Sequence, residues 1–156
     1  MKLLYFSLVC PHLTYCITVW GNAADYLLNN LLLLQKKFVR LICKTNYLAH
    51  THDLFKNLQL LTIHDLYEFY VDLYTFKVKN NLSPLNRINI TFSHNQVYNL
   101  RRGNDIDFQY CRTSIRKKFI AFTAIEFWTA LPPYLKLITS FSLFKKTTFN
   151  FLINRY

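Results

Sequence analysis

Apolar residues recur along much of this chain with the period of an α-helix. Between residues 25 and 44 they are spaced four, three, four and three apart, at Leu27, Leu31, Leu34, Phe38 and Leu41. Such a stripe is typical of one face of an amphipathic helix. Asp25 precedes the stripe in the position of an N-cap.

Two further helices are predicted from capping signals. Thr62 and Asp65 form the S/T-x-x-D pattern of a helix N-terminus, and the apolar spacing behind them predicts a helix to about Lys79. Ser140 or Ser142 caps a closing helix that runs toward the end of the chain. One face of that helix is expected to carry Phe144, Thr148, Phe151 and Leu152.

Shorter elements are delimited by breakers and caps. Pro11 is expected to end the first apolar element, because the residue before a proline avoids the helical region. A short helix is predicted within 46–61, with Thr51 as its cap, and another over 124–131 that ends at Pro132.

The remaining segment, 82–111, is polar, rich in asparagine and without clear periodicity, so we interpret it as a long loop. Residues 112–122 fit either a strand or the start of a helix. The chain has 2 glycines and 4 prolines, too few turn formers for a many-stranded sheet fold. We therefore predict a mainly α fold, with room for one small β-hairpin around residues 97–122.

Charge changes the picture more than composition does. Hydrophobic content of 52% excludes a disordered chain. Net charge is +11, with seven Lys and Arg against five Asp and Glu in residues 1–78 and twelve against three in residues 79–156. A basic surface attracts phosphate polymers. On the first long helix, Lys36, Lys37, Arg40 and Lys44 fit either a solvated face or a face that rests on a phosphate backbone.

Candidate chemistry is sparse. The only close acidic pair is Asp105-x-Asp107, which is more typical of a surface turn than of a metal site. Six scattered residues match no usual zinc spacing: Cys10, His12, Cys16, Cys43, His50 and His52. Neither glycine follows a Ser or Cys, which excludes a nucleophile elbow, and no Gly-rich phosphate loop exists. The residues themselves predict no catalytic apparatus.

The opening stretch LYFSLVCPHLTYCITVWGN, residues 4–22, resembles the thumb-region segment of jockey-type non-LTR retrotransposon reverse transcriptases. The likeness continues in family order through LQKKFVRLI (34–42), HTHDLFKNL (50–58), NNLSP (80–84), YNLR (98–101) and FWTALP (127–132). It ends with the closing helix of 140–156. No single motif is specific, but their ordered succession is. Leu100 and Thr129 depart from the family's usual Thr and Asn, and Thr123-Ala124 stands where its Gly is usual.

The resemblance implies a domain plan: a thumb-like helical region at 1–80, a long polar loop at 81–111 and a basic helical C-terminal extension at 112–156, together one truncated unit. It also implies that the endonuclease, fingers and palm are absent from this chain. The family's palm aspartates hold two Mg²⁺ ions, so we expect no cofactor here and no polymerase activity from this chain alone.

Thumb helices grip template–product duplex through its backbone. We therefore expect contacts to RNA–DNA hybrid or RNA, with the missing palm and fingers as a further partner. We expect no membrane partner and an intracellular protein, nuclear or cytoplasmic. The candidate phosphate-contacting residues are Lys36, Lys37, Arg40, Lys44, Arg101, Arg102, Arg112, Arg116, Lys117 and Lys118.

Alternatives remain open at this point. The abundance of Phe and Tyr also suits a helical protein-interaction module, and the chain could be a functionless remnant of a mobile element. A basic amphipathic membrane binder fits less well, because the basic residues are dispersed. Seven aromatic or aliphatic residues are predicted to be core: Tyr5, Trp20, Phe38, Phe55, Leu66, Trp128 and Phe144.

Overall fold

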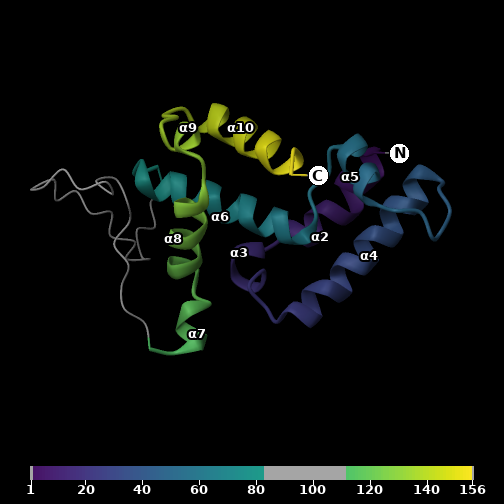
Figure 1. The fold of residues 1–156 in the computed structure, drawn as a ribbon, viewed down its shortest axis with the longest axis horizontal. Coiled ribbons are helices and arrows are strands. Elements are labelled where there is room, and N and C mark those ends of the chain that lie inside the picture. Colours follow the sequence, from purple (N-terminus) through teal and green to yellow (C-terminus); the bar gives the residue numbers. More distant parts are fainter. Residues whose placement is uncertain (1, 83–111, 156) are drawn as a thin grey trace, which may run out of the picture. The chain divides into compact units, whose positions relative to one another are not determined.

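The computed structural model describes residues 2–82 and 112–155, and every regular element within them is a helix (Figure 1). The fold is therefore mainly α, as predicted. Residues 112–122, which fit either a strand or the start of a helix, contain a helical turn and the start of a helix, while 97–111 lie outside the described residues. Among the described helices, none has the length and apolar character needed to cross a membrane.

The chain divides into two compact units, Met1–Tyr70 with Lys146–Tyr156, and Val71–Lys145. The first unit contains α1 (Lys2–Leu4), the π-helical segment η1 (Tyr5–Val9), α2 (Cys10–Thr14), α3 (Ile17–Trp20), α4 (Asp25–Cys43), α5 (His52–Leu58), the first part of α6 (Ile63–Lys79) and the last part of α10 (Phe141–Ile153). The second contains the rest of α6 and α10, together with α7 (Ser114–Lys117), α8 (Ile120–Ala130) and α9 (Pro133–Lys136).

Pro11 does not end the first element, so that prediction was wrong. The chain is helical from Lys2 to Thr14 and passes through Pro11 by way of η1, where the Cys10 N–H bonds to the Tyr5 carbonyl five residues back. A proline in a helix lacks a donor and crowds the carbonyl four residues before it. The wider π-turn just before Pro11 accommodates both effects.

Helix α4 does not bury its conspicuous apolar stripe. The stripe from Leu27 to Leu41 is mostly exposed: Leu27, Leu34 and Leu41 are 45%, 60% and 71% exposed. The buried residues lie one position further along, at Leu28, Gln35, Val39 and Ile42. Both rows have helical spacing, and the polar Gln35 in the middle of the buried row makes it the less conspicuous one.

The predicted caps of α4 and α5 also need correction. Ala24, not Asp25, is the N-cap of α4, because its extended backbone leaves its carbonyl to accept the N–H of Leu27 at 2.9 Å. Asp25 is the first helical residue, where its charge still suits the helix dipole. Thr51 is the N-cap of α5 as predicted, but its backbone carbonyl, not its hydroxyl, makes the cap contact, to the Phe55 N–H at 3.0 Å.

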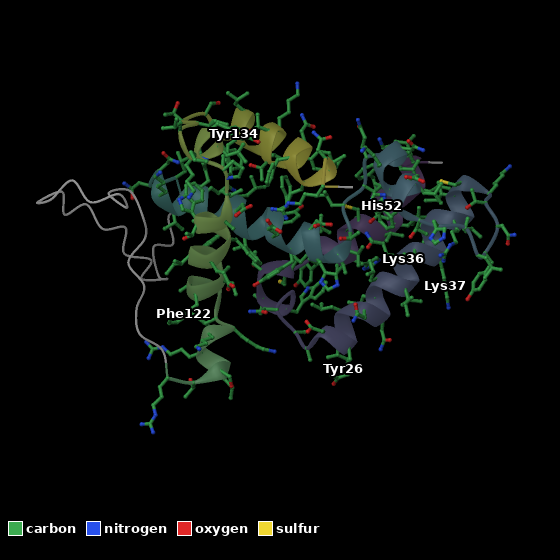
Figure 2. All side chains as sticks on the ribbon, viewed as in Figure 1. Tyr26, Lys36, Lys37, His52, Phe122 and Tyr134 are labelled. Atoms are coloured by element: carbon green, nitrogen blue, oxygen red, sulfur yellow. The ribbon has the colours of Figure 1, made fainter. Side chains whose placement is uncertain are left out.

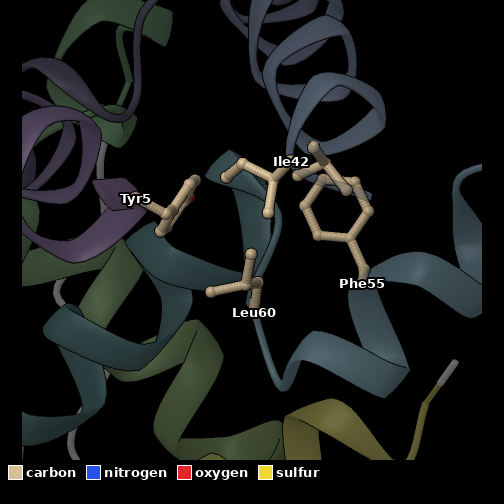
Figure 3. Close-up of a cluster of buried hydrophobic side chains, with 5 residues drawn as sticks. Tyr5, Ile42, Phe55 and Leu60 are labelled. Carbon is tan, nitrogen blue, oxygen red and sulfur yellow. The ribbon is translucent and has the colours of Figure 1, made fainter. Parts of the chain in front are cut away.

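A cluster of apolar side chains holds α4 against η1 and α5 (Figure 3). Its members come from four segments of the first unit and are each at least nine-tenths buried: Tyr5, Val39, Ile42, Phe55 and Leu60. Burial of side chains this large contributes about 1.5–3 kcal/mol each. The cluster is therefore the main reason that the N-terminal segment and α5 are fixed to α4.

Gly21, at the C-terminal end of α3, is required for space. A Cβ at this position would collide with the Tyr67 ring and lie 2.5 Å from the Ile17 carbonyl oxygen. Its φ of −66° is open to any residue, so the constraint is steric and not conformational. The absence of a side chain lets α3 approach α6 closely.

The capping prediction for α6 is confirmed. The Asp65 N–H donates to the Thr62 hydroxyl at 3.4 Å, and that hydroxyl donates to the Asp65 carboxylate. The helix then runs from Ile63 to Lys79, the end that its spacing predicted. Within the first unit, the Arg155 guanidinium, just after α10, lies 2.7 Å from the Glu68 carboxylate on α6.

The second unit is organised around stacked aromatic rings. Phe76 and Phe144 stack at 4.4 Å between ring centroids, and Trp128 lies 5.9 Å from Phe144. The Lys79 ammonium lies over the Trp128 ring at 5.1 Å, and Lys136 donates to the Thr129 carbonyl at 3.1 Å near the end of α8. Burial lowers the pKa of Lys79, and the Lys136 charge lowers it further.

Most of the predicted core is buried. Five of the seven predicted residues are buried: Tyr5, Phe55, Leu66, Trp128 and Phe144. Trp20 and Phe38 are only half-buried. On α10 the predicted face is confirmed for Phe144, Thr148 and Leu152, each fully buried, while Phe151 is half-buried.

Candidate nucleic-acid interface

Four of the candidate basic residues lie on or just after α4, on the side of the helix that neither the buried row nor the exposed apolar row occupies. Lys37 and Lys44 are exposed, whereas Lys36 and Arg40 are half-buried. Figure 2 shows Lys36 and Lys37 at adjacent positions of the helix. Residues 26–52 contain no Asp or Glu, so this stretch of chain carries positive charge without a neighbour in sequence to neutralise it.

Gln35 fixes the position of these cations from the buried side of the helix. Its side-chain N–H groups donate to the Tyr5 hydroxyl at 2.7 Å and the Leu61 carbonyl at 2.9 Å, and its oxygen accepts the Ile63 N–H at 3.1 Å. A carbonyl only accepts and an amide N–H only donates, so the orientation of the Gln35 amide is determined. Gln35 thereby satisfies the first N–H of α6, which no helical carbonyl can reach.

The same network affects Tyr5. Burial raises the pKa of the Tyr5 phenol, and the hydrogen bond from Gln35 lowers it by a smaller amount. The phenol therefore stays protonated at neutral pH and serves as a hydrogen-bonding group of the core.

Arg40 has a structural contact that separates it from the three lysines. Its Nε donates to the Ala49 carbonyl at 2.9 Å, and its guanidinium lies 5.8 Å from the centre of the Tyr47 ring. These contacts hold the segment between α4 and α5. Arg40 is thus placed near the predicted interface but is also part of the local fold.

The second basic group lies on and around α7, in the other unit. Its members are all exposed: Arg112, Arg116, Lys117 and Lys118. Arg116 lies 6.0 Å from the centre of the Phe122 ring. Residues 108–125 contain no acidic residue. Arg101 and Arg102 lie outside the described residues. The other candidates form two groups, one on and just after α4 in the first unit and one on and around α7 in the second.

The six scattered Cys and His residues lie on α2, α4 and α5 and, for Cys16 and His50, in the segments just before α3 and α5. Within 2–82 and 112–155, no three His, Cys, Asp or Glu residues lie close enough to hold a metal ion. Cys10, Cys16 and Cys43 are free thiols, and burial raises the pKa of Cys10. Asp105 and Asp107 lie outside the described residues.

Sequence reasoning missed the role of Gln35 and the exposure of the Leu27–Leu41 row. The signal for Gln35 was present, because a lone polar residue followed four and seven positions later by Val39 and Ile42 completes a helical row. No family model matches this chain, and comparisons with curated proteins and with solved structures found no significant match either.

Proposed function

We propose that this chain binds the sugar–phosphate backbone of nucleic acid, as the thumb and post-thumb part of a non-LTR retrotransposon reverse transcriptase. The observation that carries the proposal is the placement of Lys36, Lys37 and Lys44 on one side of a well-anchored helix. Lysines on a rigid element contact phosphates without reading the base sequence. The ordered motif succession supplies the family.

The exposed basic group around α7 supports the same proposal. Two separate acid-free stretches of the chain each present several cations, and this pattern suits a polymer with regularly spaced phosphates better than a single small anion. The proposal assigns no catalytic activity to this chain alone, since the family's polymerase reaction depends on palm aspartates. Nucleotide incorporation by this chain alone would contradict that part.

The test is binding of a fluorescently labelled RNA–DNA hybrid, followed by anisotropy over a series of salt concentrations. Affinity should fall steeply with salt, and Lys36→Ala/Lys37→Ala should reduce the slope of log K against log salt by roughly 2 if both lysines contact phosphates. Arg40 is left unchanged, because its loss would also loosen the Ala49 contact.

A matched control removes the same charge elsewhere. Lys145 and Lys146 are adjacent exposed lysines on α10, and Lys145→Ala/Lys146→Ala should weaken binding less than the α4 pair. Equal losses from both variants would mean that net charge alone drives binding. Absence of binding at low salt would overturn the proposal.

A further inference from the structure

The exposed apolar row of α4 has the spacing of a coiled-coil seam. Leu27, Leu31, Leu34, Phe38 and Leu41 alternate in steps of four and three, which are the a and d positions of a heptad repeat. Leu27, Leu34 and Leu41 are the exposed ones, and Leu31 and Phe38 are half-buried. At a rise of 1.5 Å per residue, the part from Leu31 to Leu41 is about 15 Å long.

This row forms one wall of an apolar groove of about 450 Å³, here called the α4 groove. Leu31, Leu34, Phe38 and Leu41 form the α4 wall, and Val9 and Leu13 form the opposite wall. A groove between two helical segments fits a third helix, whose side chains enter the space between the two rows.

The two flanks of the seam differ. The residues that directly follow Leu27, Leu34 and Leu41 on one flank are Leu28, Gln35 and Ile42, and they are buried in the unit's own core. On the other flank, Lys37 and Lys44 lie seven residues apart and are exposed, and Lys37 also lines the groove. Residues at these flanking positions select a coiled-coil partner by charge.

The charge of this open flank decides between occupants. In an antiparallel pair of two copies, Lys37 and Lys44 of one copy would face the same lysines of the other copy. In a parallel pair, these lysines would have to face the flank that is already buried in each copy. A helix with acidic flanking residues would pair with Lys37 and Lys44 while burying the seam. We propose that the α4 groove docks an acidic amphipathic helix of a partner protein.

The test uses the full chain and a labelled synthetic peptide of about 14 residues, roughly 21 Å as a helix, with leucines at heptad spacing and glutamates at the flanking positions. The glutamate peptide should bind at least about tenfold more tightly than a version with lysines in their place. Leu34→Ser/Leu41→Ser should weaken binding at least about tenfold. Both side chains are exposed, so the fold should be retained.

Two further variants sharpen the test. Leu137, which is 80% exposed and does not line the groove, gives the matched control: Leu137→Ser should leave peptide binding unchanged. Lys37→Glu should reduce binding of the glutamate peptide and improve binding of the lysine peptide. Equal binding of the two peptides to the parent chain would overturn the proposal.

The other occupants appear as distinct outcomes. Sedimentation that shows a dimer dispersed by Leu34→Ser/Leu41→Ser would assign the groove to a second copy and overturn the proposal. Binding to phosphatidylcholine–phosphatidylserine vesicles that the same variant abolishes would assign it to a membrane surface instead. Neither leucine belongs to the proposed phosphate contacts, so hybrid binding retained in this variant separates the two proposals.

Discussion

Replacement of Gln35 by leucine tests whether one buried amide joins three segments of the first unit. Gln35 is 2% exposed and bonds to Tyr5 in η1, to Leu61 before α6 and to Ile63 at its first turn. Leucine has a similar size but neither donor nor acceptor. The Leu61 carbonyl and the Ile63 N–H then lose their Gln35 partner in a place that water does not reach.

The expected cost follows from the three hydrogen bonds. Each contributes about 0.5–1.5 kcal/mol net, and a buried group left unsatisfied costs about 1–3 kcal/mol. Leucine recovers part of this through its apolar surface. We expect Gln35→Leu to lower the free energy of unfolding by about 2–4 kcal/mol, a large share of the roughly 5–15 kcal/mol of a typical domain.

The measurement is urea unfolding followed by circular dichroism, with thermal melts in parallel. For a chain of this length the melting temperature should fall by roughly 5–15 °C. Asn29→Leu, at an exposed position of the same helix, is the matched control and should leave stability unchanged within about 0.5 kcal/mol.

Tyr5→Phe completes the design. It removes one of the three bonds and should cost about 1 kcal/mol alone, and less in the Gln35→Leu background, because that bond is already lost. Should Gln35→Leu melt within the range of Asn29→Leu, the amide would not join the three segments and the reasoning would be refuted.

Three further predictions concern packing and charge. Gly21→Ala should lower the free energy of unfolding by about 1–3 kcal/mol in urea titrations, and by clearly less in a Tyr67→Ala background, because the Tyr67 ring occupies the space that the new Cβ needs. Trp128→Ala should cost about 3–5 kcal/mol, since the indole is 1% exposed, and a loss below about 1 kcal/mol would show that the second unit does not depend on it. The pKa of Lys79 is lowered in the folded chain, so between that lowered value and the ordinary 10.5 the unfolded chain binds more protons, and this group makes stability rise with pH. Lys79→Met should flatten that rise when the free energy of unfolding is measured from neutral to alkaline pH. An unchanged slope would contradict the lowered pKa of Lys79.

The parts of the fold that the sequence predicted are those set by local signals. The Thr62 and Asp65 pair caps α6, and the spacing behind it gave the correct end at Lys79. Such features depend on residues within one or two turns of each other, so their physics is complete within a short window of sequence.

The errors arose where a distant contact or a rare geometry decides. Pro11 ordinarily ends a helix, and only the π-turn of η1 lets the helix continue. Helical spacing predicts one side of α4 for its basic residues, but the bond from Arg40 to Ala49 depends on a loop whose path no periodicity encodes. The same limit applies to the partners of Gln35, which lie 26 or more residues away in sequence.

Helix α4 shows why a hydrophobic pattern alone leaves a face undecided. It carries two apolar rows of helical spacing, and the row with the larger leucine content is the exposed one. The buried row contains the polar Gln35, whose amide is satisfied by hydrogen bonds inside the unit. Exposure of such a row costs free energy in solution unless something covers it. An acidic helix along the seam would cover this row, and the lysines beside the row also offer contacts to phosphates on the basic side of the helix. The two proposals therefore rest on adjacent surfaces of one helix and share Lys37, and Leu34→Ser/Leu41→Ser distinguishes them, because it should weaken peptide binding and leave hybrid binding intact.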